Sequence, residues 1–172
     1  MKTYVLMIAR LFPTKHPRKG DYTFFPDKIS LAMGEYNETV FIEEFGCLLP
    51  KFHTLRANFP LWEKRIEEVN AGRARLSIRY WSGVPYKSIQ VEFASLTECG
   101  IQKVMFAHQP GYASVAFPFI IPSKHEDPQY RNVAIHELSK NDALSINDFK
   151  AWFKGYDLSK PLAIIQFTTF RY

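Results

Sequence analysis

The sequence predicts a single α+β domain, and three observations carry this prediction. The chain has 172 residues, a length that suits one domain, with or without insertions. Apolar segments typical of strands recur along the chain, and segments with helical spacing and capping residues lie between them. The composition is globular, with 47% apolar, 23% charged and 16% aromatic residues, so a core can form without disulfides or a metal.

The first element is a predicted strand over residues 3–9, an apolar run without interruption. It does not resemble a signal peptide, because no small-residue cleavage site follows and Arg10 and Pro13 come next. No apolar run approaches the length of a membrane span, so we expect no membrane partner.

The loop over residues 12–21 contains two prolines and a glycine and is strongly cationic. Its Gly20 allows close approach of the backbone to an anion, which makes Lys19 a candidate contact to phosphate. A solvated surface loop with no ligand explains the same residues equally well.

A helix is predicted over residues 26–33, where Pro26 begins it and Gly34 ends it. Residues 36–49 are harder to assign, and their segment 39–42 could be a strand or a hairpin arm.

The second predicted helix covers residues 59–71, with Asn58 as its cap and Gly72 at its end. Strands are then predicted over residues 74–81, which alternate cleanly, and over residues 86–96 after a Gly-Pro turn.

The outer face of the strand over residues 74–81 carries Arg79 and Trp81. Arginines beside an indole form a plausible surface for phosphate binding and base stacking. The alternative is a polar outer face on which Trp81 covers a hydrophobic edge.

The third predicted helix covers residues 145–154, with Ser145 as a strong N-cap, and a closing strand follows over residues 162–170. Residues 99–135 contain strand-like stretches, and we interpret them as an insertion into the single domain 1–172.

Charge and composition narrow the classes of partner. The net charge of +5 permits nucleic acid as a partner without requiring it. The five histidines and two cysteines show no metal-binding spacing, and no cofactor fingerprint is present, so we expect neither metal nor cofactor. Cys47 and Cys99 are expected to be free, buried thiols in a reducing cytoplasm.

The densest group of functional residue types is Lys51-x-x-Thr54-x-Arg56, in a predicted strand over residues 51–56 that follows Pro50. Strand alternation places Thr54 and Arg56 on one face. Lys51 is three residues from Thr54, so a regular strand would place them on opposite faces. We therefore predict an irregular backbone at Pro50-Lys51 that turns Lys51 toward Thr54.

This motif resembles the signature of the ASCH domain, a member of the PUA-like superfamily, over about residues 45–98 and 140–172. The form with Thr is similar to small bacterial ASCH proteins that act as N4-acetylcytidine amidohydrolases. Leu49 stands where the signature has Gly, and the chain is longer than compact members of that branch. The resemblance implies a mixed, mostly antiparallel β-barrel with flanking helices.

The resemblance also implies catalytic roles for Lys51 and Thr54, together with a downstream carboxylate. In the family this carboxylate lies three residues before the cap of the last helix, which corresponds to Asp142 here. Asp is shorter than the family's Glu, and Glu137 is the second candidate.

Two functions follow from these patterns. The first, which the sequence favours, is a PUA-like domain that binds RNA or a modified nucleotide. Its cationic cleft would be bordered by Lys19, Arg56, Arg79 and Trp81. The alternative is a small amidohydrolase that acts on an N4-acylated cytidine or a related nucleobase. Whether the protein is an enzyme, what it binds and how it assembles stay open at this point.

Overall fold

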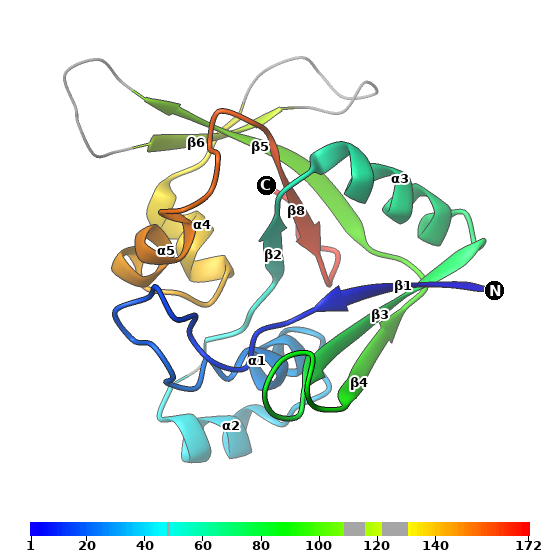
Figure 1. Ribbon diagram of the computed structural model, residues 1–172, viewed down its shortest axis with the longest axis vertical. Helices are drawn as coiled ribbons and strands as arrows, with labels where there is room; N and C mark the ends of the chain where they lie inside the picture. The colour runs from blue at the N-terminus through cyan, green and yellow to red at the C-terminus, as the bar shows by residue number, and fades with distance from the viewer. Residues whose placement is uncertain (48, 109–115, 122–130) are drawn as a thin grey trace.

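The computed structural model describes residues 1–47, 49–108, 116–121 and 131–172, and the side chains of 108 and 116–121 are not described. The fold is α+β, with two sheets whose strands pair mostly antiparallel (Figure 1). In the three-stranded sheet, β1 runs parallel to β3, and β4 pairs antiparallel with β3. The strands of this sheet are β1 (Lys2–Met7), β3 (Ala74–Trp81) and β4 (Gln90–Leu96).

The five-stranded sheet is antiparallel throughout, in the order β2-β8-β5-β6-β7. Its strands are β2 (His53–Arg56), β8 (Leu162–Gln166), β5 (Gly100–His108), β6 (Ala116–Ile121) and β7 (Arg131–Asn132). The described strands therefore form two sheets and no single closed barrel, so the predicted barrel is not confirmed. The α+β class and the mostly antiparallel pairing are confirmed.

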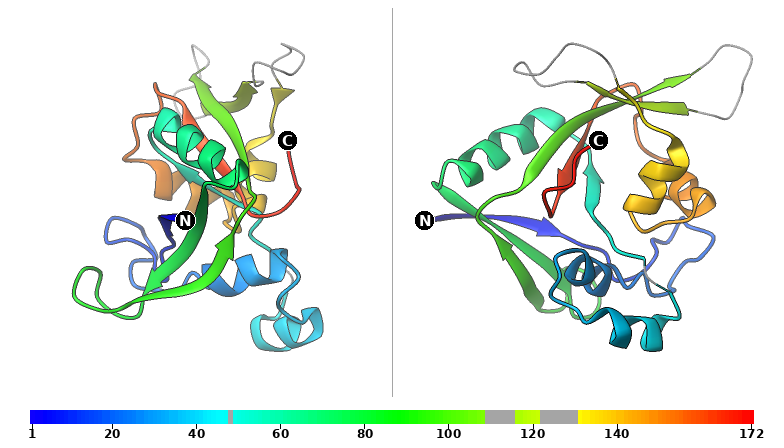
Figure 2. Two further views of the ribbon diagram at one scale, coloured as in Figure 1. Left: turned by 90° about the vertical axis from the view of Figure 1, so that its right-hand side faces the viewer. Right: turned by 180° about the vertical axis from the view of Figure 1, so that it is seen from behind.

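Helices cover several sides of the two sheets. The helix α3 lies on one side of the molecule, and α4 and α5 lie together on the other (Figures 1 and 2). The helices are α1 (Phe25–Ala32), α2 (Glu38–Phe45), α3 (Phe59–Asn70), α4 (Ile135–Asn141) and α5 (Ile146–Phe153). None of these helices in the described part of the chain is long and apolar enough to cross a membrane.

Local sequence explains where most helices begin. The side-chain oxygens of Asn58 and Ser145 accept hydrogen bonds from backbone N–H groups in the first turns of α3 and α5. The same holds for Asn37 at the start of α2. The prediction of a strand or hairpin arm over 39–42 was therefore wrong, because this cap and the left-handed Gly46 (φ 75°) enclose a short helix.

The predicted strand over 74–81 is found with the same bounds as β3, and the other four predicted strands are shorter than the sequence patterns indicated. The strand predicted over 51–56 begins only at His53, the one over 86–96 begins at Gln90, and the one over 162–170 ends at Gln166. The one over 3–9 is found as β1, which ends at Met7.

The predicted insertion covers residues 99–135, and its first part, β5, is an inner strand of the five-stranded sheet. β5 pairs with β8 on one side and with β6 on the other. Residues 109–115 and 122–130 of that segment lie outside the described residues.

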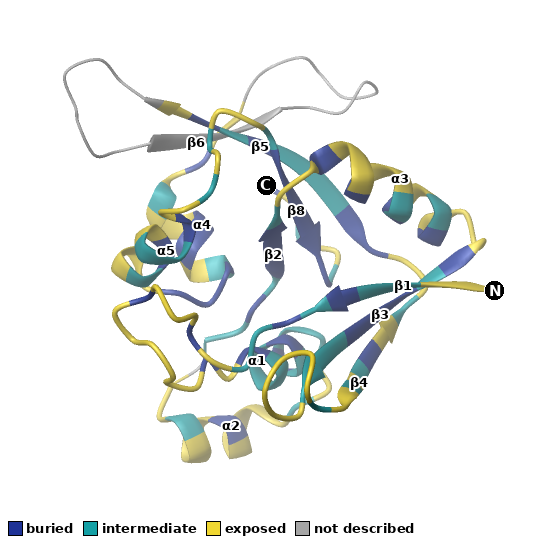
Figure 3. Cartoon of the chain, viewed as in Figure 1, coloured by how far each residue is buried: buried dark blue, intermediate teal, exposed yellow. Residues whose placement is uncertain are grey.

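The apolar core lies against β2, β8 and β3, where buried residues gather in the middle of the molecule (Figure 3). All five residues of β8 are buried, and the core side chains of α3 pack into the same cluster. Burial of this continuous apolar surface is the main stabilising contribution to the fold. Cys99 is buried in it, whereas Cys47 is exposed, so the expectation of a buried thiol was wrong for Cys47.

Candidate functional site

The backbone just before β2 is held by two different neighbours. The N–H of Lys51 donates to the carbonyl of Lys28 in α1 (2.9 Å), and the N–H of Phe52 donates to the carbonyl of Asn141 at the end of α4 (2.9 Å). The register of β2 with β8 runs from His53, and one further bond, from the N–H of Phe167 to the carbonyl of Phe52 (3.0 Å), extends the pairing as far as Phe52 but not to Lys51. Lys51 is therefore released from strand alternation, and its side chain reaches the same cavity as that of Thr54.

That cavity has a volume of about 230 Å³ and is the centre of the candidate site. Four polar side chains line it: Lys51, Thr54, Arg56 and Asp142. The remaining walls are the end of β1, the ring of Phe25, and aromatic side chains from α5 and the residues after it. These last residues are Trp152, Phe153 and Tyr156.

Lys51 and Asp142 form a buried ion pair. The Nζ of Lys51 donates to the carboxylate of Asp142 and also to its backbone carbonyl (2.7 Å). The ammonium lies 4.0 Å from the centre of the Phe25 ring, and the residue is only 1% exposed. Burial lowers the pKa of Lys51 to about 8, although the Asp142 carboxylate acts in the opposite direction.

Burial also raises the pKa of Asp142, against the influence of Lys51. Both members of the pair are therefore shifted toward their neutral forms. A lysine in this state can release its proton close to neutral pH, which an exposed lysine does not do.

The end of α4 fixes the direction of Asp142. Ala143 adopts a left-handed conformation (φ 57°), and its N–H donates to the carbonyl of Lys140 (2.9 Å). The N–H of Leu144 donates to the carbonyl of Ser139 (2.9 Å). This pair of bonds closes the helix in the manner of a Schellman motif. It leaves both the carbonyl and the carboxylate of Asp142 directed at Lys51.

Arg56 is the second cation of the cavity. Its Nη1 donates to Thr54 Oγ1 (3.0 Å), and its Nη2 donates to the carbonyl of Met7 (2.6 Å). Among the described residues no carboxylate lies within ion-pair distance of its guanidinium. Burial lowers the pKa of Arg56, yet a guanidinium keeps its charge in proteins. The cavity therefore has a cation without an ion-pair partner in the described part of the chain, and an electron-rich ligand could approach it.

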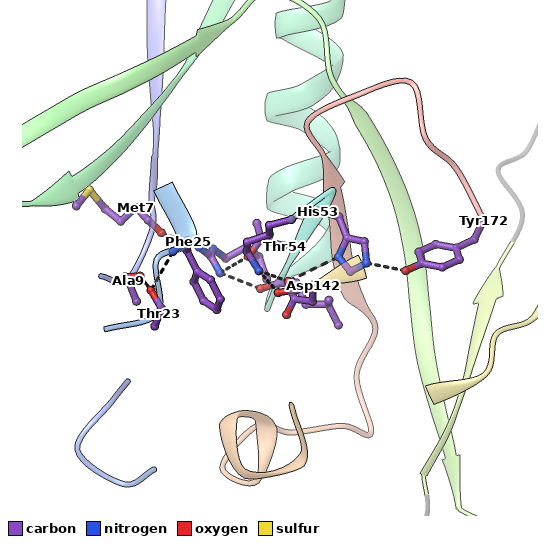
Figure 4. Close-up of polar contacts among 11 residues, drawn as sticks. Met7, Ala9, Thr23, Phe25, His53, Thr54, Asp142 and Tyr172 are labelled. Atoms are coloured by element: carbon purple, nitrogen blue, oxygen red, sulfur yellow. Dashed lines mark hydrogen bonds and ion pairs between the residues drawn. The ribbon is translucent and has the colours of Figure 1, made fainter. Parts of the chain in front are cut away.

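His53 lies between Asp142 and Tyr172 on the far side of β2 (Figure 4). Its Nε2 is 2.6 Å from the Tyr172 hydroxyl, which accepts a hydrogen bond from Nδ2 of Asn141 (3.2 Å). The hydroxyl therefore has its own hydrogen free to donate to Nε2. That leaves the proton of the neutral imidazole on Nδ1, which is 3.7 Å from Oδ1 of Asp142.

Burial and the nearby Lys51 cation lower the pKa of His53 well below its ordinary value, in agreement with a neutral ring. Nδ1 of His53 is a buried atom with no hydrogen-bond partner in the described structure. Asp142 thus has the Lys51 cation on one side and the neutral His53 ring, too distant for a hydrogen bond, on the other.

The structure separates the two candidate carboxylates. Asp142 lies in the cavity, whereas Glu137 is exposed in the first turn of α4 and does not line it. The choice of Glu137 as the second candidate is therefore not supported by its position.

The four residues proposed to border one cationic cleft are not brought together. Arg56 alone lines the cavity. Lys19 is exposed in the loop before α1. Arg79 lies on the three-stranded sheet, where its Nη2 forms an ion pair with Oε2 of Glu92 (3.3 Å). Trp81 packs against Tyr86 at the hairpin that follows β3 (ring centres 5.3 Å apart). Arg79 and Trp81 lie on β3, which belongs to a different sheet from β2, so strand pairing does not place their side chains beside Arg56.

Sequence reasoning missed the aromatic walls and the residues behind Asp142. Phe25 and Tyr172 reach the site through packing of distant segments, and no local pattern indicates this. Trp152 and Tyr156 are four residues apart at the end of a helix, a spacing that could have indicated one aromatic wall. Among the described residues no group of three metal-ligating side chains is present.

A comparison of the chain with known protein families, with curated proteins and with solved structures finds no significant match.

Proposed function

We propose that the protein is a small amidohydrolase that removes an acyl group from the exocyclic amine of a nucleobase. An N4-acylated cytidine is the substrate to test first. The observation that carries the proposal is the meeting of a buried Lys51–Asp142 pair with Thr54 and Arg56 around one cavity. Hydrolysis of an amide needs a nucleophile, a group that moves protons and a stabiliser of the oxyanion, and these residue types supply all three.

In the proposed reaction, Lys51 in its neutral form takes a proton from the Thr54 hydroxyl or from a water that Thr54 positions. The oxygen attacks the acyl carbon, and the carbonyl oxygen gains negative charge next to the Arg56 guanidinium. Lys51 then passes its proton to the leaving amine as the C–N bond breaks. If Thr54 is the nucleophile, water releases the acyl group from it in a second step, and the products are a carboxylic acid and the free nucleobase amine.

The size and charge of the cavity support a small, electron-rich substrate. Its 230 Å³ is below the ~300–1,000 Å³ of pockets for drug-sized ligands, so one base with a short acyl group is a suitable occupant. The aromatic side chains of α5 offer stacking surfaces, and the carbonyl oxygen of an amide is a suitable acceptor for Arg56.

A second candidate is a module that binds a modified nucleotide or RNA without reacting with it. The observation in its favour is that both described hydrogen bonds of the Lys51 ammonium already go to Asp142. In a pure binding site such a pair would serve as a rigid wall, and Arg56 would hold the ligand.

The proposal extends to the fold family and to the location of the protein in the cell. We place the two sheets and their flanking helices in a PUA-like arrangement of the ASCH type, supported by the Lys51-x-x-Thr54-x-Arg56 motif and by Asp142 three residues before Ser145. The free thiols of Cys47 and Cys99 fit a reducing cytoplasm.

The test is incubation of the purified protein with N4-acetylcytidine, with release of cytidine followed by chromatography. We expect turnover by the unchanged protein, and a loss of at least about 100-fold in kcat for Thr54→Val, which keeps the shape of the side chain but removes the hydroxyl. Glu137→Gln serves as the matched control and should leave kcat within about twofold. Binding of the nucleoside without release of cytidine would favour the binding module, and neither binding nor release would reject both candidates.

A further inference from the structure

A second cavity of about 230 Å³ is lined by the neighbours of residues that line the first. Ala9 and Phe25 line the first cavity, and the adjacent Arg10 and Phe24 line the second. Thr23 joins these two segments, because its hydroxyl donates to the carbonyl of Ala9 (2.8 Å) and its N–H donates to that of Arg10 (2.8 Å) (Figure 4). The two cavities therefore share a wall.

Aromatic rings form the apolar part of the second cavity. Tyr22 and Phe24 are stacked, with ring centres 5.7 Å apart and planes inclined by 29°. The ring of Phe45 packs edge-on against Phe24 at 4.9 Å. Tyr22 is 55% exposed and Phe24 is 41% exposed, so both rings keep accessible surface on which a ligand could pack.

The backbone at Phe24 is held in an unfavourable conformation. Its φ is 53°, in the left-handed region, which costs roughly 1–2 kcal/mol for a residue with a side chain. The N–H groups on either side of it bond to Arg10 and to Thr23, and these bonds fix the turn. Strain of this kind concentrates at ligand sites, where it directs a side chain to a position that a relaxed backbone would not give.

Charged groups of both signs lie around these rings. The guanidinium of Arg10 lies over Tyr22 (5.7 Å) and over Tyr80 (5.0 Å), and its Nη1 donates to the carbonyl of Ser82 (3.1 Å). Asp27 from α1 and Glu44 from α2 also line the cavity. The cavity thus offers a donor group, two acceptor groups and aromatic faces.

This combination narrows the chemistry of the occupant. A cation would meet Arg10, and an anion would meet two carboxylates. A purely apolar group would leave unused the donors and acceptors that remain on these side chains, of which Arg10 already donates to Ser82 and Glu44 already accepts from Tyr36. A neutral, flat ring with donors and acceptors on its edge satisfies every group at once. Nucleobases have this form, because their faces stack on aromatic side chains and their edges carry N–H groups and carbonyl or ring acceptors.

We infer that the second cavity binds a nucleobase adjacent to the one in the first cavity. The substrate would then be a single strand of nucleic acid rather than a free nucleoside. This inference rests on the proposed function for the identity of the base in the first cavity. The affinity of the second cavity for a base does not depend on that reaction.

The test compares N4-acetylcytidine as a nucleoside with the same base in the middle of an RNA trinucleotide. We expect kcat/KM to be at least about fivefold higher for the trinucleotide, since stacking of one base on an aromatic side chain is worth roughly 1–3 kcal/mol, or about 5- to 150-fold. Tyr22→Ala should remove most of this advantage and leave kcat/KM for the nucleoside unchanged, and Tyr22→Phe should retain it. Tyr86→Ala, which removes a 90% exposed ring outside the cavity, is the matched control.

Binding of an unacylated RNA trinucleotide, measured by calorimetry, separates this inference from the proposed function. If no acylated substrate is hydrolysed, weaker binding by Tyr22→Ala than by Tyr86→Ala still supports a base site in the second cavity. Equal binding by the two variants overturns the inference. A trinucleotide that is hydrolysed no better than the nucleoside overturns it as well, even if the hydrolysis itself confirms the proposed function.

Discussion

Replacement of Lys51 by Met is the sharpest test of the buried ion pair. Met keeps a long, apolar stem against the Phe25 ring but removes the ammonium that donates to Asp142. The Asp142 carboxylate is then buried without a close cation among the described residues, because the Nδ1 of the neutral His53 lies at 3.7 Å and Arg56 acts on it only from beyond ion-pair distance. The structure therefore predicts a large loss of stability for this variant.

The expected loss follows from the cost of a buried charge without a partner. Removal of one member of a buried pair costs about 3–5 kcal/mol, and we expect Lys51→Met to lie in this range at pH 7. The double variant Lys51→Met/Asp142→Asn removes the orphaned charge as well. Its loss should be at least about 2 kcal/mol smaller than the sum of the two single losses.

The loss should also depend on pH. The pKa of Asp142 is already raised by burial, and removal of Lys51, which lowers it, raises it further. A carboxyl whose pKa is higher in the folded than in the unfolded state favours folding at low pH, and this contribution is lost as pH rises through the folded pKa. The variant should therefore lose less stability relative to the unchanged protein at pH 5 than at pH 7.

Urea unfolding at both pH values, followed by the fluorescence of the three tryptophans, measures these differences. Lys150→Met, an exposed lysine on α5, is the matched control and should change the free energy of unfolding by less than about 0.5 kcal/mol. A loss below about 1 kcal/mol for Lys51→Met at pH 7, or strictly additive losses in the double variant, would refute the reasoning.

Three further outcomes are expected. kcat/KM for an acylated cytidine should rise about tenfold per pH unit and level off near pH 8, because Lys51 must lose a proton of pKa about 8 to act as a base; a flat profile from pH 6 to 9 would exclude this role. Ala143→Val should cost about 2 kcal/mol in urea unfolding, because a β-branched residue is strained at φ 57°, whereas Ala143→Gly should cost far less; equal losses would show that the turn is not strained. Tyr172→Phe should cost about 1–3 kcal/mol, because it leaves Nε2 of His53 without its donor; an unchanged urea midpoint would contradict the network assigned to the ring.

The local sequence pattern was enough to predict those helices and strands whose formation depends on residues close together in the chain. The caps at Asn58 and Ser145 and the alternation over 74–81 identify α3, α5 and β3, because a cap or an amphipathic period is satisfied within a few residues of itself. Both structures suggested for residues 39–42, a strand or a hairpin arm, were wrong, because these residues belong to the helix α2.

The sequence by itself also indicated the side chains of the candidate site. Lys51, Thr54 and Arg56 stood out by their types and spacing, and the resemblance to the ASCH signature added Asp142. Only the tertiary structure decided that they meet. Lys51 turns into the cavity because its backbone bonds to α1 rather than to β8, and Asp142 faces it because α4 closes in a left-handed turn. Arg79 and Trp81 have equally suitable chemistry but lie on the other sheet, and strand pairing between segments far apart in the chain determines that separation.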